Sequence, residues 1–151
     1  MDFDIHRLPV FAGLREEHIK SILTLIESFK CESGITVIRQ GFPADHFYVI
    51  LKGKVQISFK PYDSSPITVS HVEAGGLFGW SAVIGSEHYT SSAVAIESLE
   101  AVRIRGDELR KLSAENPEAG REILNSLASS VSARWKNAHE EVRLMLEKGM
   151  K

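Results

Sequence analysis

The chain has 151 residues, the size of one ordinary domain, and its 43% hydrophobic and 25% charged residues are typical of a globular protein with a core of its own. A formal net charge of −2 provides no strongly basic face, so we expect no direct nucleic-acid binding by this chain. No apolar run approaches the ~18 residues of a membrane-spanning helix, and the N-terminus does not resemble a signal peptide, so we expect no membrane partner.

Cys31 is the only cysteine. A single cysteine excludes an intramolecular disulfide and any cluster held by several thiolates, and it fits a reducing compartment. We therefore expect a cytoplasmic protein in which Cys31 is a small, inert residue at the start of a strand.

The first predicted element is a helix between residues 14 and 26, in which apolar side chains recur at helical spacing: Leu14, Ile19, Ile22, Leu23 and Ile26. From Phe29 to Ile104 the chain is rich in strand formers and is broken by turn residues. Six runs there are each about a strand long: ITVIRQ, HFYVILKG, KVQISF, ITVSHV, SAVAIE and EAVRIR. Many short strands at regular spacing predict a barrel or jelly roll, and hence a mainly β fold with flanking helices.

Residues 78–95, FGWSAVIGSEHYTSSAVA, form the most informative stretch of this strand-rich zone. We expect a strand that ends at Phe78-Gly79, a short helical turn from Ser81 to Ile84, a Gly85-Ser86 break and a second strand from Thr90. Helix N-termini and tight glycine turns direct backbone N–H groups at one spot, which suits an anion such as a phosphate.

The last zone is helical. A short helix is predicted from Asp107 to Glu115. Asn116 is expected to cap a long helix that begins at Pro117 and runs towards Lys148. One face of the long helix carries a heptad seam: Leu124, Ala128, Val131, Trp135, Ala138, Val142 and Met145. A second set, Ile123 and Leu127, is expected to pack on the barrel.

About thirty helical residues reach roughly 45 Å, which is longer than a barrel of this size is wide. An apolar stripe that extends past its own core needs another partner, so we expect a homodimer through the C-terminal helix. The alternative is one amphipathic helix that covers its own domain. We divide the chain into a barrel unit, residues 1–116, and a dimerisation helix, residues 117–151, with no helix-turn-helix.

The order of these elements resembles the cyclic-nucleotide-binding domain of catabolite-activator-type (Crp/Fnr) regulators, protein kinase A regulatory subunits and gated channels. The resemblance extends over nearly the whole chain. It is carried by the 78–95 stretch and by LPVFAGLREEHIKSIL, GFPADHFYVILKGKVQIS and DELRKLSAENPE. The resemblance implies a cupin-like double-stranded β-helix (jelly-roll) barrel, with an N-terminal helix and a long C-terminal dimerisation helix.

In that family, a cassette glutamate binds the ribose 2′-hydroxyl and a cassette arginine binds the cyclic phosphate. Trp80 and Tyr89 hold these two positions here. Trp has one donor and no charge, and Tyr is neutral at pH 7, so neither replaces the lost charge. With hydrogen bonds to charged groups at ~1.5–3 kcal/mol each, we expect a micromolar affinity to fall towards millimolar.

The candidate ligand-binding residues are Phe78, Gly79, Trp80, Ser81, Ala82, Tyr89, Thr90, Ser91, Arg134 and Trp135. The resemblance places Arg134 and Trp135 where family members let the long helix touch the base of the ligand, and Arg134 could return a positive charge. Alternatively, Trp135 belongs only to the helix seam and Arg134 is a solvated flank. Trp80 is either a stacking surface or an aromatic side chain that fills the pocket.

Other chemistries find little support in the sequence. The six histidines are scattered, and His46 and His71 lie on predicted strands without a visible third ligand, so we expect no metal site. A catalytic pairing of Ser81 with His88 has no third member, so we expect no enzyme and no required cofactor. The hypothesis is a sensor module that binds a nucleotide or other small anion weakly or atypically and signals through a helix dimer. The alternative is a ligand-independent dimerisation or protein-docking module with its pocket plugged by Trp80.

Overall fold

The computed structural model describes residues 8, 10–61 and 65–129. Two antiparallel four-stranded sheets face each other, with strand orders β1-β8-β3-β6 and β2-β7-β4-β5. Their elements are α1 (Glu16–Leu23), β1 (Glu27–Cys31), β2 (Thr36–Ile38), β3 (His46–Lys52), β4 (Lys54–Phe59), β5 (Ile67–Glu73), β6 (Leu77–Phe78), α2 (Trp80–Ile84), β7 (Ser92–Ala95), β8 (Leu99–Arg105) and α3 (Gly106–Glu115). Residues 117–129 are also helical. The predicted fold class, a mainly β jelly roll with flanking helices, is confirmed.

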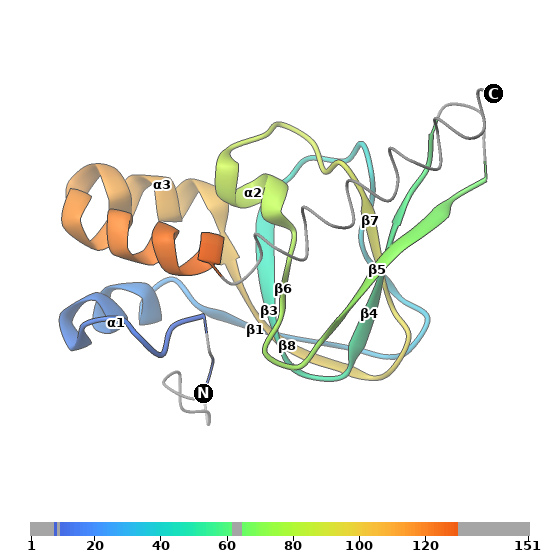
Figure 1. The fold of residues 1–151 in the computed structure, drawn as a ribbon, viewed down its shortest axis with the longest axis horizontal. Helices are drawn as coiled ribbons and strands as arrows, with labels where there is room; N and C mark the ends of the chain where they lie inside the picture. Colours follow the sequence, from blue (N-terminus) through green and yellow to red (C-terminus); the bar gives the residue numbers. More distant parts are fainter. Residues whose placement is uncertain (1–7, 9, 62–64, 130–151) are drawn as a thin grey trace.

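The sheet that contains β3 and β8 is buried on both faces, because its side chains alternate between two hydrophobic clusters. Figure 1 shows α1 and α3 on one side of this sheet and β4, β5 and β7 on the other. In β3, Phe47 and Val49 face the helices, whereas Tyr48 and Ile50 face the second sheet. Burial on both faces explains why β3 is a continuous apolar run rather than an alternating one.

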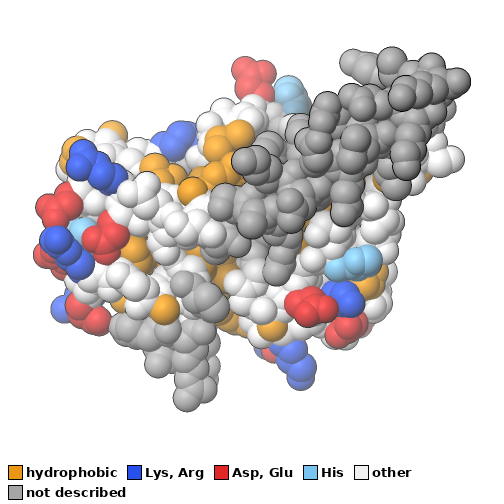
Figure 2. Space-filling model, viewed as in Figure 1, with side chains coloured by type: hydrophobic (Ala, Val, Ile, Leu, Met, Phe, Trp, Pro, Cys, Tyr) orange, Lys and Arg blue, Asp and Glu red, His pale blue; other side chains and the backbone are white. Residues whose placement is uncertain are grey.

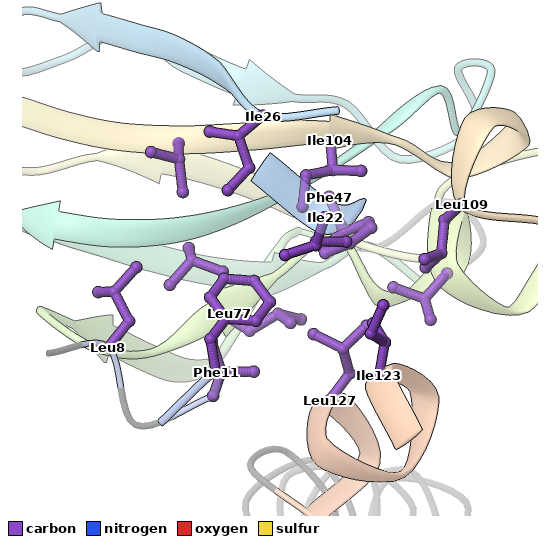
Figure 3. Close-up of a cluster of buried hydrophobic side chains, with 14 of the residues drawn as sticks. Leu8, Phe11, Ile22, Ile26, Phe47, Leu77, Ile104, Leu109, Ile123 and Leu127 are labelled. Atoms are coloured by element: carbon purple, nitrogen blue, oxygen red, sulfur yellow. The ribbon is translucent and has the colours of Figure 1, made fainter. Parts of the chain in front are cut away.

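We call the two groups the helix-side cluster and the barrel-side cluster. The buried members of the helix-side cluster, part of which is shown in Figure 3, are Leu8, Val10, Phe11, Leu14, Ile19, Ile22, Ile26, Phe47, Val49, Leu77, Ala82, Val83, Val102, Ile104, Leu109, Ala119, Ile123 and Leu127. Those of the barrel-side cluster are Ile38, Tyr48, Ile50, Val55, Val72, Phe78, Tyr89, Ala93, Ala95, Leu99 and Ala101.

Two predicted boundaries at the start of the fold are wrong. The first helix ends at Leu23, because Leu25 and Ile26 then form turn hydrogen bonds to Ile22 and Leu23. Ile26 keeps its helical spacing because the turn returns it to the helix-side cluster. A strand, β1, follows at once, so Cys31 lies at the end of a strand and not at its start. Burial raises the pKa of the Cys31 thiol, which agrees with an inert residue.

The C-terminal helix packs on the barrel unit through the two residues predicted to do so. Ile123 and Leu127 are both 0% exposed and belong to the helix-side cluster. Asn116 is the N-cap, since the Ala119 backbone N–H donates to its Oδ1 over 3.2 Å. In the seam, Leu124 and Ala128 are half-buried. The other seam residues lie outside the described part of the chain: Val131, Trp135, Ala138, Val142 and Met145.

Charged side chains join α1 to helical residues 117–129, and Figure 2 shows such side chains gathered at the α1/α3 end of the molecule. The Arg15 backbone N–H, at the N-cap of α1, donates to Glu122 Oε1 over 2.7 Å. The Arg15 guanidinium lies 2.8 Å from Glu118 Oε1. His18 is 2% exposed, and its Nδ1 lies 3.0 Å from Glu122 Oε2. One helix therefore supplies the partners for the N-terminus of the other.

Replacing Ile123 with alanine tests how much the C-terminal helix contributes to the core. The change Ile123→Ala leaves a cavity in the helix-side cluster, and we expect the free energy of unfolding in urea to fall by about 2–5 kcal/mol. Asn125→Ala, on the exposed face of the same helix, should change it by less than about 0.5 kcal/mol. Equal effects of the two changes would show that the helix does not pack on the barrel unit.

The Arg15 backbone N–H, helped by the nearby His18 and Arg15 side chains, holds the pKa of Glu122 below its usual range. Because the folded-state pKa is the lower one, the stabilisation is complete above the ordinary glutamate pKa of about 4.3. It is lost as the pH falls through the depressed folded-state value. We expect Glu122→Gln to remove this part of the acid destabilisation, measured as the free energy of unfolding between pH 7 and pH 3. Glu115→Gln, an exposed carboxylate on α3, is the control; identical pH profiles for the two variants would contradict the assignment.

Candidate functional site

The candidate site begins where β6 ends, at the edge of the sheet. Phe78 pairs with Tyr48 of β3, and Gly79 then adopts a left-handed φ of 85°. A Cβ at Gly79 would lie 2.9 Å from the His46 carbonyl oxygen and 3.1 Å from the Phe47 Cα. Both the positive φ and the close approach to β3 require glycine here.

Gly79 turns the chain directly into the short helix α2, which ends at Gly85 with a second left-handed φ of 81°. The predicted helical turn is confirmed and begins one residue earlier, at Trp80. Ser81 and Ala82 are buried, so α2 is packed into the molecule and not laid on its surface. The Ala82 backbone N–H donates to the Gly79 carbonyl oxygen over 3.0 Å, whereas the N–H groups that open a helix have no acceptor within it.

The C-terminal end of α2 is held by α3, a contact that the sequence analysis missed. Arg110 Nη1 donates to the Ala82 carbonyl oxygen over 2.8 Å. A Cβ at Gly106 would lie 2.1 Å from the same oxygen, so only glycine lets the two helices approach this closely. The signal in the sequence is a glycine at the junction of a strand and a helix, where no loop needs one.

Tyr89, which the sequence analysis places at the position of the family's arginine, is a structural link in this protein. It is 7% exposed, and its hydroxyl donates to the His46 carbonyl over 2.6 Å and accepts from the His46 N–H over 3.1 Å. Burial raises the pKa of Tyr89 to about 12, so the side chain is neutral at physiological pH. Gly41 and Phe42 bond to the Tyr89 backbone, so the second strand starts at Ser92 and not at Thr90 as predicted.

The other predicted ligand residues occupy different surroundings. Phe78 belongs to the barrel-side cluster and stacks on Tyr48 with ring centroids 4.8 Å apart. Trp80 is half-buried and packs against the helix-side cluster. Thr90 is exposed and Ser91 is half-buried. Arg134 and Trp135 lie outside the described residues, and their proposed contact with a ligand stays a prediction.

The sequence analysis also missed a cluster of charged and aromatic side chains around Arg103, on the barrel-facing side of β8. Arg103 pairs with Tyr48 of β3 and with Glu27 of β1. Its guanidinium lies 5.5 Å from the centroid of the Phe29 ring, and its Nε lies 3.3 Å from Glu27 Oε2. The run LEAVRIR contains the signal: Leu99 and Ala101 are buried in the barrel-side cluster, so period-2 alternation places Arg103 on the same face.

One group of three metal-ligating side chains occurs in the part of the chain that the structure describes: Glu17, His18 and Glu118, with ligand atoms within 4.8 Å of one another. The Arg15 guanidinium already lies against both carboxylates, at 3.9 Å and 2.8 Å. The group is therefore an ion-pair network in which an arginine supplies the positive charge. His46 and His71 lie on β3 and β5, as predicted. Across the described ranges, the helices are all too short or too polar to cross a bilayer.

Comparisons with known proteins agree on one family. A family model described as the cyclic nucleotide-binding domain matches residues 29–116. A CRP-like cAMP-activated global transcriptional regulator of Mycobacterium tuberculosis is 29% identical over 128 residues, which cover 85% of this chain and 57% of the regulator. A solved structure from Geobacter metallireducens is 32% identical, with a TM-score of 0.73, and the match covers 83% of this chain and 91% of that one.

A more distant structure shares the fold. The regulatory subunit of a cAMP-independent protein kinase A from Trypanosoma brucei is 15% identical, with a TM-score of 0.74, and the match covers 91% of this chain and 48% of that one. The chain thus spans about half the length of this subunit and of the mycobacterial regulator.

Removing the Tyr89 hydroxyl tests whether it is a structural link. Tyr89→Phe leaves the His46 N–H and carbonyl without this partner, and we expect the free energy of unfolding to fall by about 1–3 kcal/mol. Thr90→Val removes an exposed hydroxyl from the next residue and should change it by less than about 0.5 kcal/mol. A cost for Tyr89→Phe no larger than that of Thr90→Val, in urea titrations, would contradict the link.

Proposed function

The chain belongs to the cyclic nucleotide-binding domain family, and from this membership we propose that it is a regulatory sensor module with weak or atypical binding of a cyclic nucleotide or other small anion. We propose that it acts in the cytoplasm as a homodimer, and that it is neither an enzyme nor a direct reader of nucleic acid. An output domain or partner would complete the signalling path, since the chain spans 57% of the mycobacterial regulator.

The proposal is supported by a cassette whose backbone conformation suits an anion but whose side chains differ from those of the family. The Gly79 turn, α2 and Gly85 keep the geometry that presents backbone N–H groups to an anion. Tyr89 stands where the family has its phosphate-binding arginine, and its hydroxyl is engaged by both backbone groups of His46. A neutral hydroxyl that is already bonded in both directions is a poor phosphate anchor.

The relatives differ in what their names say of cAMP. The mycobacterial regulator is called cAMP-activated, whereas the trypanosomal subunit belongs to a kinase called cAMP-independent. Membership of the family and its fold is therefore compatible with either behaviour. The residues of the cassette must decide the ligand, which is why Trp80 and Tyr89 are central to the proposal.

Signalling would use the contacts that connect the cassette to the helices. Arg110 and Gly106 tie the end of α2 to α3, and the chain continues from α3 into helical residues 117–129. The ion pair of Arg15 with Glu118 and the hydrogen bond from the Arg15 backbone N–H to Glu122 couple α1 to that helix. A ligand that shifts α2 would thus bias both helices, and the homodimer would sense it through the seam of the C-terminal helix.

The alternative, a ligand-independent dimerisation or docking module plugged by Trp80, draws less support. A plug would have to fill the space on the barrel side of the cassette. Trp80 instead packs with the helix-side cluster, on the other face of the sheet. Its large aromatic surface is used there as part of the core.

Calorimetric titration with cAMP and cGMP tests the proposal. We expect the wild-type protein to bind with a dissociation constant of about 0.1–1 mM, because a charge-assisted bond of about 1.5–3 kcal/mol is missing from the cassette. Trp80→Glu combined with Tyr89→Arg should tighten binding at least tenfold. Trp80→Gln combined with Tyr89→Gln removes the same aromatic rings without adding charge and should not tighten it.

Two results would contradict the proposal. Micromolar binding by the wild-type protein would contradict the weak binding that the changed cassette predicts. Binding that is absent from both the wild type and the charged double variant would favour the ligand-independent alternative, provided that circular dichroism shows the variant to be folded.

A further inference from the structure

Arg103 lies on the face of the sheet that a ligand of the proposed module would meet. Across β8, β3 and β6 the register aligns Arg103 with Tyr48, and Tyr48 with Phe78. Directly paired residues share a face, and Tyr48 and Phe78 both belong to the barrel-side cluster. Two strand spacings, about 10 Å in all, therefore separate the backbone of Arg103 from that of the residue before Gly79.

The surroundings of Arg103 present its guanidinium rather than bury it. The side chain is 30% exposed, whereas Tyr48 and Phe78 are each 4% exposed. Phe29 lies against the cation, and the Tyr48 hydroxyl forms a hydrogen bond with Arg103. These aromatic contacts fix the direction of the side chain and use little of its charge.

A chain of contacts connects this cation to the cassette. Tyr48 stacks on Phe78 in nearly parallel geometry, with 2° between the ring planes. Tyr48 and Tyr89 both belong to the barrel-side cluster, and the Tyr89 hydroxyl is bonded to His46, two residues before Tyr48. Burial, reinforced by Arg103, lowers the pKa of His46, so this histidine is neutral at pH 7 and does not compete for an anion.

The counterion of Arg103 is easily exchanged. Its ion pair with Glu27 uses Nε alone over 3.3 Å, and the Glu27 side chain is 45% exposed. Pairs of this kind contribute little and compete with solvent. Arg105, on the same strand and face, differs because Asp107 binds it through two nitrogens, at 3.1 Å and 3.2 Å.

From this arrangement we propose that Arg103 is the cation that binds the phosphate of a nucleotide in this module, with Glu27 as the counterion that the phosphate displaces. The inference rests on the proposed function and adds its anion-binding residue. Arginine suits the role because its planar fork accepts two phosphate oxygens at once and is always charged. The positive charge that the cassette lacks would then come from β8, two strands from β6 in the same sheet.

The test compares cAMP with adenosine, which lacks the phosphate, in NMR titrations of the full chain. Arg103→Gln should weaken cAMP binding about 10- to 100-fold, the loss of one charge-assisted contact, and leave adenosine binding within about twofold of the wild type. Arg105→Gln removes the same charge from the same face and is the matched control, with a change in cAMP binding of no more than about threefold.

Glu27→Gln provides a readout that misfolding cannot imitate. Without its counterion Arg103 is free to meet the phosphate, so cAMP binding should tighten several-fold. Equal effects of Arg103→Gln and Arg105→Gln, or equal losses for cAMP and adenosine, would overturn the role of Arg103 while the proposed function stands. Failure of both the wild-type protein and the charged double variant Trp80→Glu/Tyr89→Arg to bind cAMP or cGMP would overturn both.

Discussion

The structure depends on one constraint: the sheet β1-β8-β3-β6 must bury both of its faces. Phe47 and Val49 hold the helices against it, while Tyr48 and Ile50 close the barrel on the other side. From Phe47 to Ile50, successive residues of β3 alternate between the two clusters, and a one-residue slip in register would exchange them. The candidate site lies at β6, the edge strand of this sheet, where the chain passes from the barrel-side Phe78 to the helix-side Trp80. A single turn therefore connects the two faces of the sheet at the candidate site.

Around that turn, the glycines are fixed by the backbone conformation, whereas Tyr89 is not. Gly79, Gly85 and Gly106 are fixed by backbone geometry and close approach, and side chains cannot replace them without strain. Tyr89 is under no such constraint, and here its hydroxyl satisfies two buried backbone groups of His46. Tyr89 therefore links its loop to the start of β3.

The helices also contact one another on their side of the sheet. Arg15 and His18 of α1 meet Glu118 and Glu122, and the Ser126 hydroxyl donates to the Val10 carbonyl. These contacts link the N-terminal segment to the C-terminal helix across more than 100 residues of sequence. Arg110 of α3 also holds α2, and the chain continues from α3 into the C-terminal helix. Contacts therefore connect the cassette, through α3, to the helix that meets α1. This set of contacts gives a small shift at α2 a route to the C-terminal helix.

Local patterns determined most of the elements. Helical spacing identified α1, the Asn116 cap and the inward residues Ile123 and Leu127, because periodicity and capping depend on neighbours in the chain. The sequence patterns did not predict strand β1, because ESFKC is an edge strand with mostly exposed residues. Only its pairing with β8 makes it a strand. The tertiary structure alone decided that Arg110 holds Ala82, that Tyr89 bonds to His46 and that Arg103 faces the barrel beside Phe29 and Tyr48. Contacts between residues far apart in sequence depend on strand register and on the approach of whole elements, which no local pattern encodes.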